Sequence, residues 1–184
     1  FKEIESFSDD FLLANRATLK DYMKKRVADP LHQWNRQWEY PYVYGKLQSM
    51  GKSNQETKVL DAGSGVTFFP YFLSKCFHNM SIHCCDYDEA LSPTFDRINE
   101  GNDKSVEFLP SDLKDLPYDS ESFDVIYCIS VLEHTDDYGN LILTIDISLD
   151  GTCDIPVDKA NSLLVTLIAN AQNIVCLPSG LNWE

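Results

Sequence analysis

Short apolar runs alternate with stretches of helical spacing over most of the chain. This alternation is typical of parallel βα units, in which each strand is followed by a helix that packs on the sheet. We expect strands at 58–62, 81–85, 106–109, 123–129 and 141–147, and helices near 68–77, 91–100 and 156–169. The pattern predicts an α/β fold with a doubly wound, mainly parallel sheet.

The region before residue 58 has a different pattern. From Ser8 onward, apolar residues recur at helical spacing, with Ser8 as the expected N-cap and Pro30 beyond the end. The apolar positions are Phe11, Leu12, Leu19, Tyr22, Met23 and Val27. The sequence predicts an amphipathic helix here.

An aromatic cluster follows around Pro41. It consists of Trp34, Trp38, Tyr40, Tyr42 and Tyr44. We expect a second helix whose rings either pack on the core or close over a ligand site. A polar linker at 51–57 then separates a predicted N-terminal helical cap, 1–57, from a compact unit, 58–184.

The charge of the chain excludes some partners. With 29 acidic and 15 basic side chains the formal net charge is −14, so the surface repels nucleic acid at long range. The apolar stretch 163–177 is short and broken by polar residues, which argues against a membrane span. Six cysteines without metal-ligand spacing indicate reduced, buried thiols, and we expect a cytoplasmic protein with no metal site.

The clearest motif is Val-Leu-Asp-Ala-Gly-Ser-Gly at 59–65, a strand that ends in a carboxylate and a glycine turn. Such a turn lets the backbone approach a ligand closely. The third glycine of a dinucleotide-binding turn is absent. The second strand ends in Asp86, 23 residues after Gly63, close to the spacing at which an acid reaches ribose hydroxyls. A nucleoside ligand is therefore favoured.

Three further motifs follow in order. They are Ser-Asp-Leu at 111–113, Ser-Phe-Asp-Val-Ile at 122–126 and Ser-Val-Leu-Glu-His at 130–134. Over roughly 58–150, this series resembles the class I S-adenosylmethionine-dependent methyltransferases, in particular their small-molecule branch. The resemblance implies a Rossmann-like sheet, S-adenosylmethionine as cofactor and S-adenosylhomocysteine as product.

The resemblance also implies a cofactor site. Asp61 would help hold the amino-acid end, Asp86 would accept from the ribose hydroxyls, and Asp112 would accept from the adenine amino group. The full set of expected cofactor-binding residues is Asp61, Gly63, Ser64, Gly65, Asp86, Tyr87, Asp112, Leu113 and Ser130. Carboxylates suit a cationic sulfonium and would repel a pyrophosphate. Each acid taken alone could equally be a capping or surface residue.

Two residues are candidates for catalysis. The resemblance places His134 at the mouth of the site, as a general base or as part of the pocket lining. Asp146 near the end of the fifth predicted strand is the second candidate, either for substrate contact or base, or as a loop-capping carboxylate. Methyl transfer works mainly through in-line positioning, so a strong base is not required.

The leading hypothesis is an enzyme that methylates an oxygen or nitrogen of a small molecule, for which a sugar or a secondary metabolite would fit. The alternative is a methyltransferase-like module that holds the cofactor or a partner protein without catalysis. A nicotinamide oxidoreductase is disfavoured by the missing glycine and the acidic residues. The sequence predicts neither the substrate nor the oligomeric state.

One connection departs from the family pattern. Only residues 135–140 separate the Glu-His pair from the fifth predicted strand, whereas parallel neighbours need a crossover of about a dozen residues or more. We therefore expect that Asn140 and Leu141 are not consecutive in the complete protein. The start at Phe1 gives the same expectation of a longer chain.

Overall fold

The computed structural model describes residues 1–24, 26, 31–32, 36–50, 56–102, 106–113, 115–129 and 131, and three short strands at 142–144, 147–148 and 155–156. Three site candidates, Ser130, His134 and Asp146, lie outside the described residues. So do the Asn140–Leu141 pair and the predicted helix 156–169, apart from Pro156, which ends a strand.

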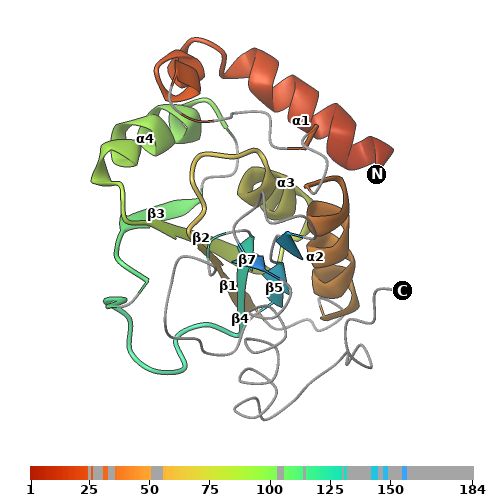
Figure 1. Cartoon of the computed structure of the whole chain (residues 1–184), viewed down its shortest axis with the longest axis vertical. Helices are drawn as coiled ribbons and strands as arrows, with labels where there is room; N and C mark the ends of the chain where they lie inside the picture. The colour runs from red at the N-terminus through yellow and green to blue at the C-terminus, as the bar shows by residue number, and fades with distance from the viewer. Residues whose placement is uncertain are drawn as a thin grey trace.

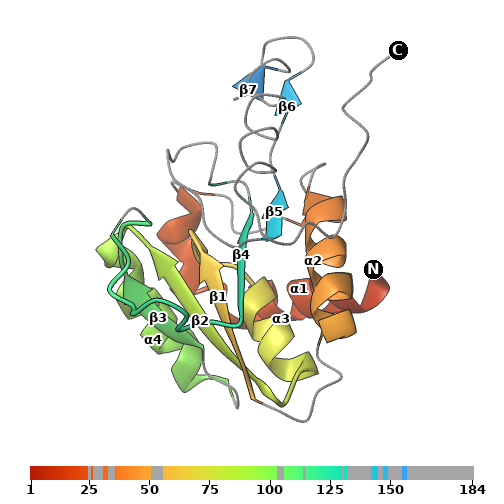
Figure 2. The same cartoon turned by 90° about the horizontal axis from the view of Figure 1, so that it is seen from below.

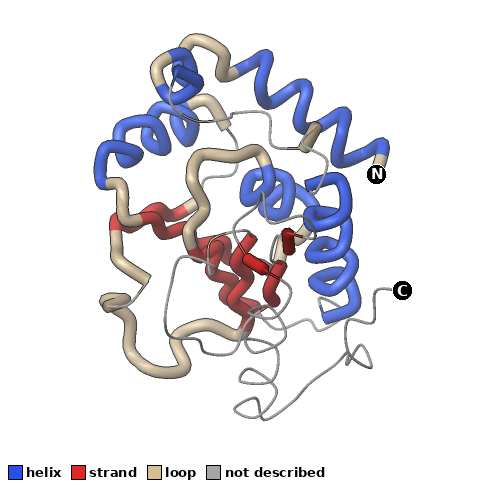
Figure 3. Tube along the Cα trace, in the orientation of Figure 1, coloured by secondary structure: helices blue, strands red, loops and turns tan. Residues whose placement is uncertain are grey.

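A five-stranded parallel sheet forms the centre of the molecule, in the order β3-β2-β1-β4-β5. Its strands are β1 (Thr57–Ala62), β2 (Met80–Asp86), β3 (Glu107–Pro110), β4 (Val125–Ile129) and β5 (Ile142–Thr144). Figure 3 shows them together as one twisted layer. The strand order reverses between β1 and β4, the point at which α/β sheets of this kind bind ligands outside their carboxyl ends. The predicted parallel α/β fold is confirmed.

The prediction of one strand over 141–147 is wrong. β5 pairs with β4 and ends at Thr144, whereas Ile147 begins β6 (Ile147–Ser148). β6 pairs with β7 (Ile155–Pro156) in a separate two-stranded sheet. The run was predicted as one strand because it is mostly apolar, but the pairing partner changes within it. The other four predicted strands begin and end within two residues of the observed ones.

The two faces of the sheet are covered differently. Helices α3 (Phe69–Cys76) and α4 (Ser92–Glu100), both predicted, share one large core with the N-terminal helices and one sheet face. The loop between β3 and β4 packs Leu113, Leu116 and Phe123 against the other face. Figure 1 shows α1 and α4 on one side of the sheet and this loop on the other. Four consecutive residues of β1, Val59–Ala62, are buried, so this strand does not show the alternation of a strand with one exposed face.

The first helix differs from the prediction. α1 spans Lys2–Ala14, so Ser8 lies inside it, fully buried, and is not its N-cap. The helix ends at Ala14 with Asn15 as its C-cap, at φ −102° and ψ 11°, and the Asn15 side-chain amide donates to the Phe11 carbonyl at 2.9 Å. Two short 3₁₀ turns follow, Thr18–Lys20 and Tyr22–Lys24. The helical spacing from Phe11 to Met23 therefore belongs to more than one element.

The predicted second helix is present as α2 (Arg36–Met50), with Pro41 inside it. Its aromatic cluster is divided between core and solvent. Tyr40 is buried, with ring centroids 5.2 Å from Phe68 and 4.6 Å from Phe69, whereas Trp38 is 72% exposed. Figure 2 shows α2 standing beside the sheet. The N-terminal helices thus contribute to the same core as the sheet.

Shortening Leu47 tests whether α2 is part of this core. Leu47 is fully buried, so Leu47→Ala should lower the free energy of unfolding by about 2–5 kcal/mol. Trp38→Ala on the same helix is the control and should change it by no more than about 0.5 kcal/mol. Urea unfolding followed by circular dichroism measures both. A Leu47→Ala effect as small as that of the control would show that α2 is not a core element.

Candidate functional site

The chain turns sharply after β1, and glycine is required at two positions of this turn. Gly63 has φ +75° and Gly65 has φ +53°, in the left-handed region that side chains disfavour. A Cβ on Gly63 would lie 2.6 Å from a methyl of Val131. The Gly63 and Ser64 amides donate to the Cys85 carbonyl at 2.8 and 2.9 Å. The turn is therefore fixed against the end of β2.

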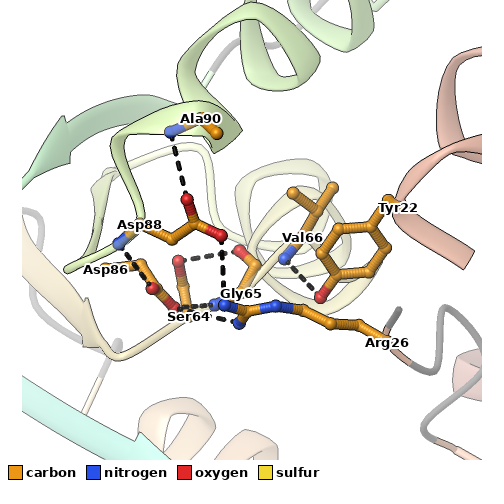
Figure 4. Close-up of polar contacts among 8 residues, drawn as sticks. All are labelled: Tyr22, Arg26, Ser64, Gly65, Val66, Asp86, Asp88 and Ala90. Atoms are coloured by element: carbon orange, nitrogen blue, oxygen red, sulfur yellow. Dashed lines mark hydrogen bonds and ion pairs between the residues drawn. The ribbon is translucent and has the colours of Figure 1, made fainter. Parts of the chain in front are cut away.

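Asp86, the last residue of β2, is the polar centre of the site. Its Oδ2 accepts from the Gly65 amide at 3.0 Å and its Oδ1 from the Asp88 amide at 3.1 Å. The residue is only 5% exposed. An ionised carboxylate has about four acceptor positions, so the two amides leave roughly two for a ligand. Figure 4 shows this carboxylate between the glycine turn and Asp88.

Asp61, near the end of β1, is buried against β4. It accepts from the Tyr127 hydroxyl at 2.9 Å, and the two residues are paired across the β1–β4 register. Burial raises the pKa of Asp61 to about 7; the Tyr127 hydrogen bond lowers it and the Asp86 charge raises it further. Asp61 is therefore a carboxyl group that gains or loses its proton near neutral pH.

The remaining predicted residues lie at the rim of the site. Asp112 is exposed in the segment after β3, and Leu113 packs its side chain on the second core cluster. This segment is joined to β2 because the Ser111 amide donates to the Asp86 carbonyl at 2.9 Å. Tyr87 is 77% exposed. The structure thus brings Asp61, Gly63–Gly65 and Asp86 together and places Asp112 at the end of the neighbouring strand.

Two residues at this site were not predicted from the sequence. The Tyr22 hydroxyl accepts from the Val66 amide at 3.1 Å, and the Arg26 guanidinium lies 3.2 Å from Asp88 and 3.9 Å from Asp86. The apolar spacing predicted Tyr22 only as part of a helix face. No pattern in the sequence indicated Arg26.

The described part of the chain holds no group of His, Cys, Asp and Glu side chains arranged to bind a metal ion, and no helix in it is long and apolar enough to cross a membrane. Its four cysteines are free thiols, and three of them, Cys84, Cys85 and Cys128, are buried.

The raised pKa of Asp61 predicts a pH-dependent effect on stability. The pKa of Asp61 is about 7 in the folded protein and exceeds its ordinary value of 3.8. The contribution of protonated Asp61 to the free energy of unfolding is therefore fully present below about pH 4 and is lost as the pH rises toward 7. Asp61→Asn removes this ionisation while keeping an acceptor for Tyr127. At pH 8 we expect Asp61→Asn to have a higher melting temperature than the unsubstituted chain. At pH 5.5 the difference in melting temperature between the two should be smaller. A difference in melting temperature that is the same at both pH values would contradict the shifted pKa.

Comparison with known proteins adds a family to this geometry. Residues 60–147 match the model of a family described as "Methyltransferase domain". No curated protein matches the chain in sequence.

Several solved structures are similar. Magnesium protoporphyrin IX methyltransferase from Synechocystis PCC 6803 is 16% identical with a TM-score of 0.48, over 94% of this chain and 73% of that one. A putative sarcosine dimethylglycine methyltransferase from Galdieria sulphuraria is 18% identical with a TM-score of 0.47, over 67% and 50%. A methyltransferase from Aquifex aeolicus is 22% identical with a TM-score of 0.42, over 50% of each chain.

This chain spans only part of the length of several similar structures. It covers 28% of the chain of coclaurine N-methyltransferase, another similar structure. The matched residues contain the glycine turn, Asp61, Asp86 and Asp112, and they include every strand of the parallel sheet from the end of β1 to β5. Over residues 60–147, this chain is therefore similar to the methyltransferase domain family.

Proposed function

We propose that this protein binds S-adenosylmethionine at the carboxyl ends of β1 and β2 and transfers its methyl group to an oxygen or nitrogen of a small molecule. One observation carries the proposal. The buried Asp86 carboxylate is held by the Gly65 and Asp88 amides, beside a turn that only glycine can form. This arrangement supports binding of a ribose close to the protein backbone.

The charges favour this cofactor over a dinucleotide. Asp61 and Asp86 are both buried at the ends of adjacent strands, and the chain has a net charge of −14. A cationic sulfonium is attracted by such a field, whereas a pyrophosphate is repelled. Phe68 stands where a dinucleotide turn would have its third glycine, five residues after Gly63. The donor and acceptor groups present therefore fit the family's cofactor.

The protein's own residues would act by binding and orientation. Asp86 would accept from the ribose hydroxyls, Asp61 in its ionised form would attract the amino group, and Asp112 and the Leu113 amide would bind the adenine edge. When bound, S-adenosylmethionine supplies an electrophilic methyl group. In-line alignment of that group with the acceptor provides most of the rate enhancement. His134 and Asp146 remain candidates for taking the proton that the acceptor loses.

The acceptor is proposed to be small rather than a nucleic acid, because the negative charge repels polyphosphates. A sugar or a secondary metabolite fits this class. The free cysteines among the described residues support a reducing compartment such as the cytoplasm.

Titration calorimetry with S-adenosylhomocysteine tests the cofactor site. Asp86→Asn keeps the size of the side chain but removes the charged acceptor, so affinity should fall by about 1–3 kcal/mol, roughly 5- to 150-fold in Kd. Asp10→Asn, at an exposed acid of α1, is the matched control and should leave Kd unchanged. NAD should not bind. Equal Kd for Asp86→Asn and the control, or tighter binding of NAD, would contradict the proposed site.

Methyl transfer itself is tested separately. The unsubstituted chain should release S-adenosylhomocysteine from S-adenosylmethionine in the presence of an acceptor from a metabolite panel. Cofactor binding without turnover by any acceptor would favour the non-catalytic module.

A further inference from the structure

Resting on the proposed function, we propose that Tyr22 and Arg26 are positioning residues of the cofactor site. They hold the glycine turn after β1 and the acidic loop after β2 in the relative position that a ribose requires. Neither residue belongs to a motif of the domain, since both precede it in sequence, outside residues 60–147.

Tyr22 contacts the turn after β1. Its hydroxyl accepts from the Val66 amide at 3.1 Å, directly after the two glycines. A Cβ on Gly65 would lie 2.9 Å from this hydroxyl, so the tyrosine packs on the backbone without room for a side chain. Burial raises the pKa of Tyr22, so its hydroxyl stays neutral. Tyr22 thus fixes the backbone whose neighbouring amide, Gly65, donates to Asp86.

Arg26 contacts the loop after β2 at three consecutive residues. The guanidinium lies 3.2 Å from Asp88 and 3.9 Å from Asp86, and 6.0 Å from the ring centroid of Tyr87. The two carboxylates have the same charge and lie two positions apart, at the end of β2 and in the loop that follows it, so they repel each other in the absence of a cation. The Arg26 side chain is only 32% exposed, so solvent screens its attraction to the two carboxylates less than at the open surface. It therefore stabilises the loop that orients Asp86.

The two contacts are coupled because the residues lie in one helical turn. The Arg26 amide donates to the Tyr22 carbonyl at 3.0 Å, so the two side chains leave the backbone four positions apart and on the same side. Figure 4 shows them side by side, with Tyr22 directed to Val66 and Arg26 to the acidic loop. One turn of the N-terminal region therefore bridges both ligand-binding turns.

This arrangement has a consequence for binding. The Asp86 carboxylate already joins the two turns through the Gly65 amide. Without the bridge from Tyr22 and Arg26, the relative position of the two turns would depend on that hydrogen bond and on those from the Gly63 and Ser64 amides to the Cys85 carbonyl. When the bridge is lost, ligand groups that contact both the turn after β1 and the loop after β2 should bind less tightly. Ligand groups that contact only one of the two should be unaffected. The ribose hydroxyls are the part of the cofactor that meets Asp86.

The test measures the Kd of S-adenosylhomocysteine and of its 2′,3′-dideoxy analogue with the full chain. We expect Arg26→Gln to raise Kd about tenfold for S-adenosylhomocysteine and about twofold or less for the dideoxy analogue. Lys24→Gln is the matched control. Lys24 is exposed, and its ammonium group forms an ion pair of 2.7 Å with Asp21 rather than with a residue of the site. It should leave both values unchanged. A general loss of structure would instead raise the Kd of both ligands by the same factor.

Milder variants keep the test valid if Arg26→Gln folds poorly. Tyr22→Phe removes only the hydroxyl and should show the same selectivity for the ribose hydroxyls, at about three- to fivefold. Combining Arg26→Gln with Asp88→Asn should give less than the product of the two single effects, because both remove the same ion pair.

The failures of the two proposals are distinguishable. If the unsubstituted chain binds S-adenosylhomocysteine but Arg26→Gln and Tyr22→Phe bind it equally well or more tightly, the positioning role is overturned and the cofactor site stands. An equal loss of affinity for S-adenosylhomocysteine and for its dideoxy analogue also overturns the positioning role. If the unsubstituted chain does not bind S-adenosylhomocysteine at all, both proposals fail.

Discussion

The hydrogen bond from the Gly65 amide to the Asp86 carboxylate joins the ends of two parallel strands, and the rest of the site depends on it. It can form because β1 and β2 are in register, with Ala62 opposite Cys85, so the turn and the acid emerge at the same level. It also requires positive φ at Gly63 and Gly65, which brings the backbone amides to face β2. A carboxylate held in this way has lost most of its freedom before any ligand arrives, so binding costs little further ordering.

The packing around this bond explains why the N-terminal helices cannot be regarded as a detached cap. Tyr40 and Leu47 of α2 share a core with Phe69 of α3, and α3 begins shortly after the glycine turn. Movement of these helices would therefore be transmitted to the turn. Tyr127 has a similar effect from β4, because its ring packs 5.7 Å from Phe69 while its hydroxyl donates to Asp61. The buried carboxyl and the aromatic core thus stabilise one geometry together.

The sequence predicts the parts of this structure that depend on local patterns. Apolar runs placed four strands within two residues, and the glycine turn and the acid at the end of the second strand, both singled out from the sequence, lie in contact in the structure. The failures have physical causes. Asn15 caps α1, and its side-chain amide donates to the Phe11 carbonyl, a contact that apolar periodicity does not report. The run at 141–147 contains a change of pairing partner. Arg26 contacts Asp88 across 62 positions of sequence, a relation that only the tertiary fold creates.

A crystal structure with S-adenosylhomocysteine tests the central claim most directly. The account predicts that the ribose hydroxyls lie within about 3 Å of the Asp86 carboxylate, with the Gly63–Gly65 backbone against the ligand and the Gly65–Asp86 hydrogen bond intact. A ligand bound elsewhere, or an Asp86 carboxylate turned away from the ribose, would contradict it.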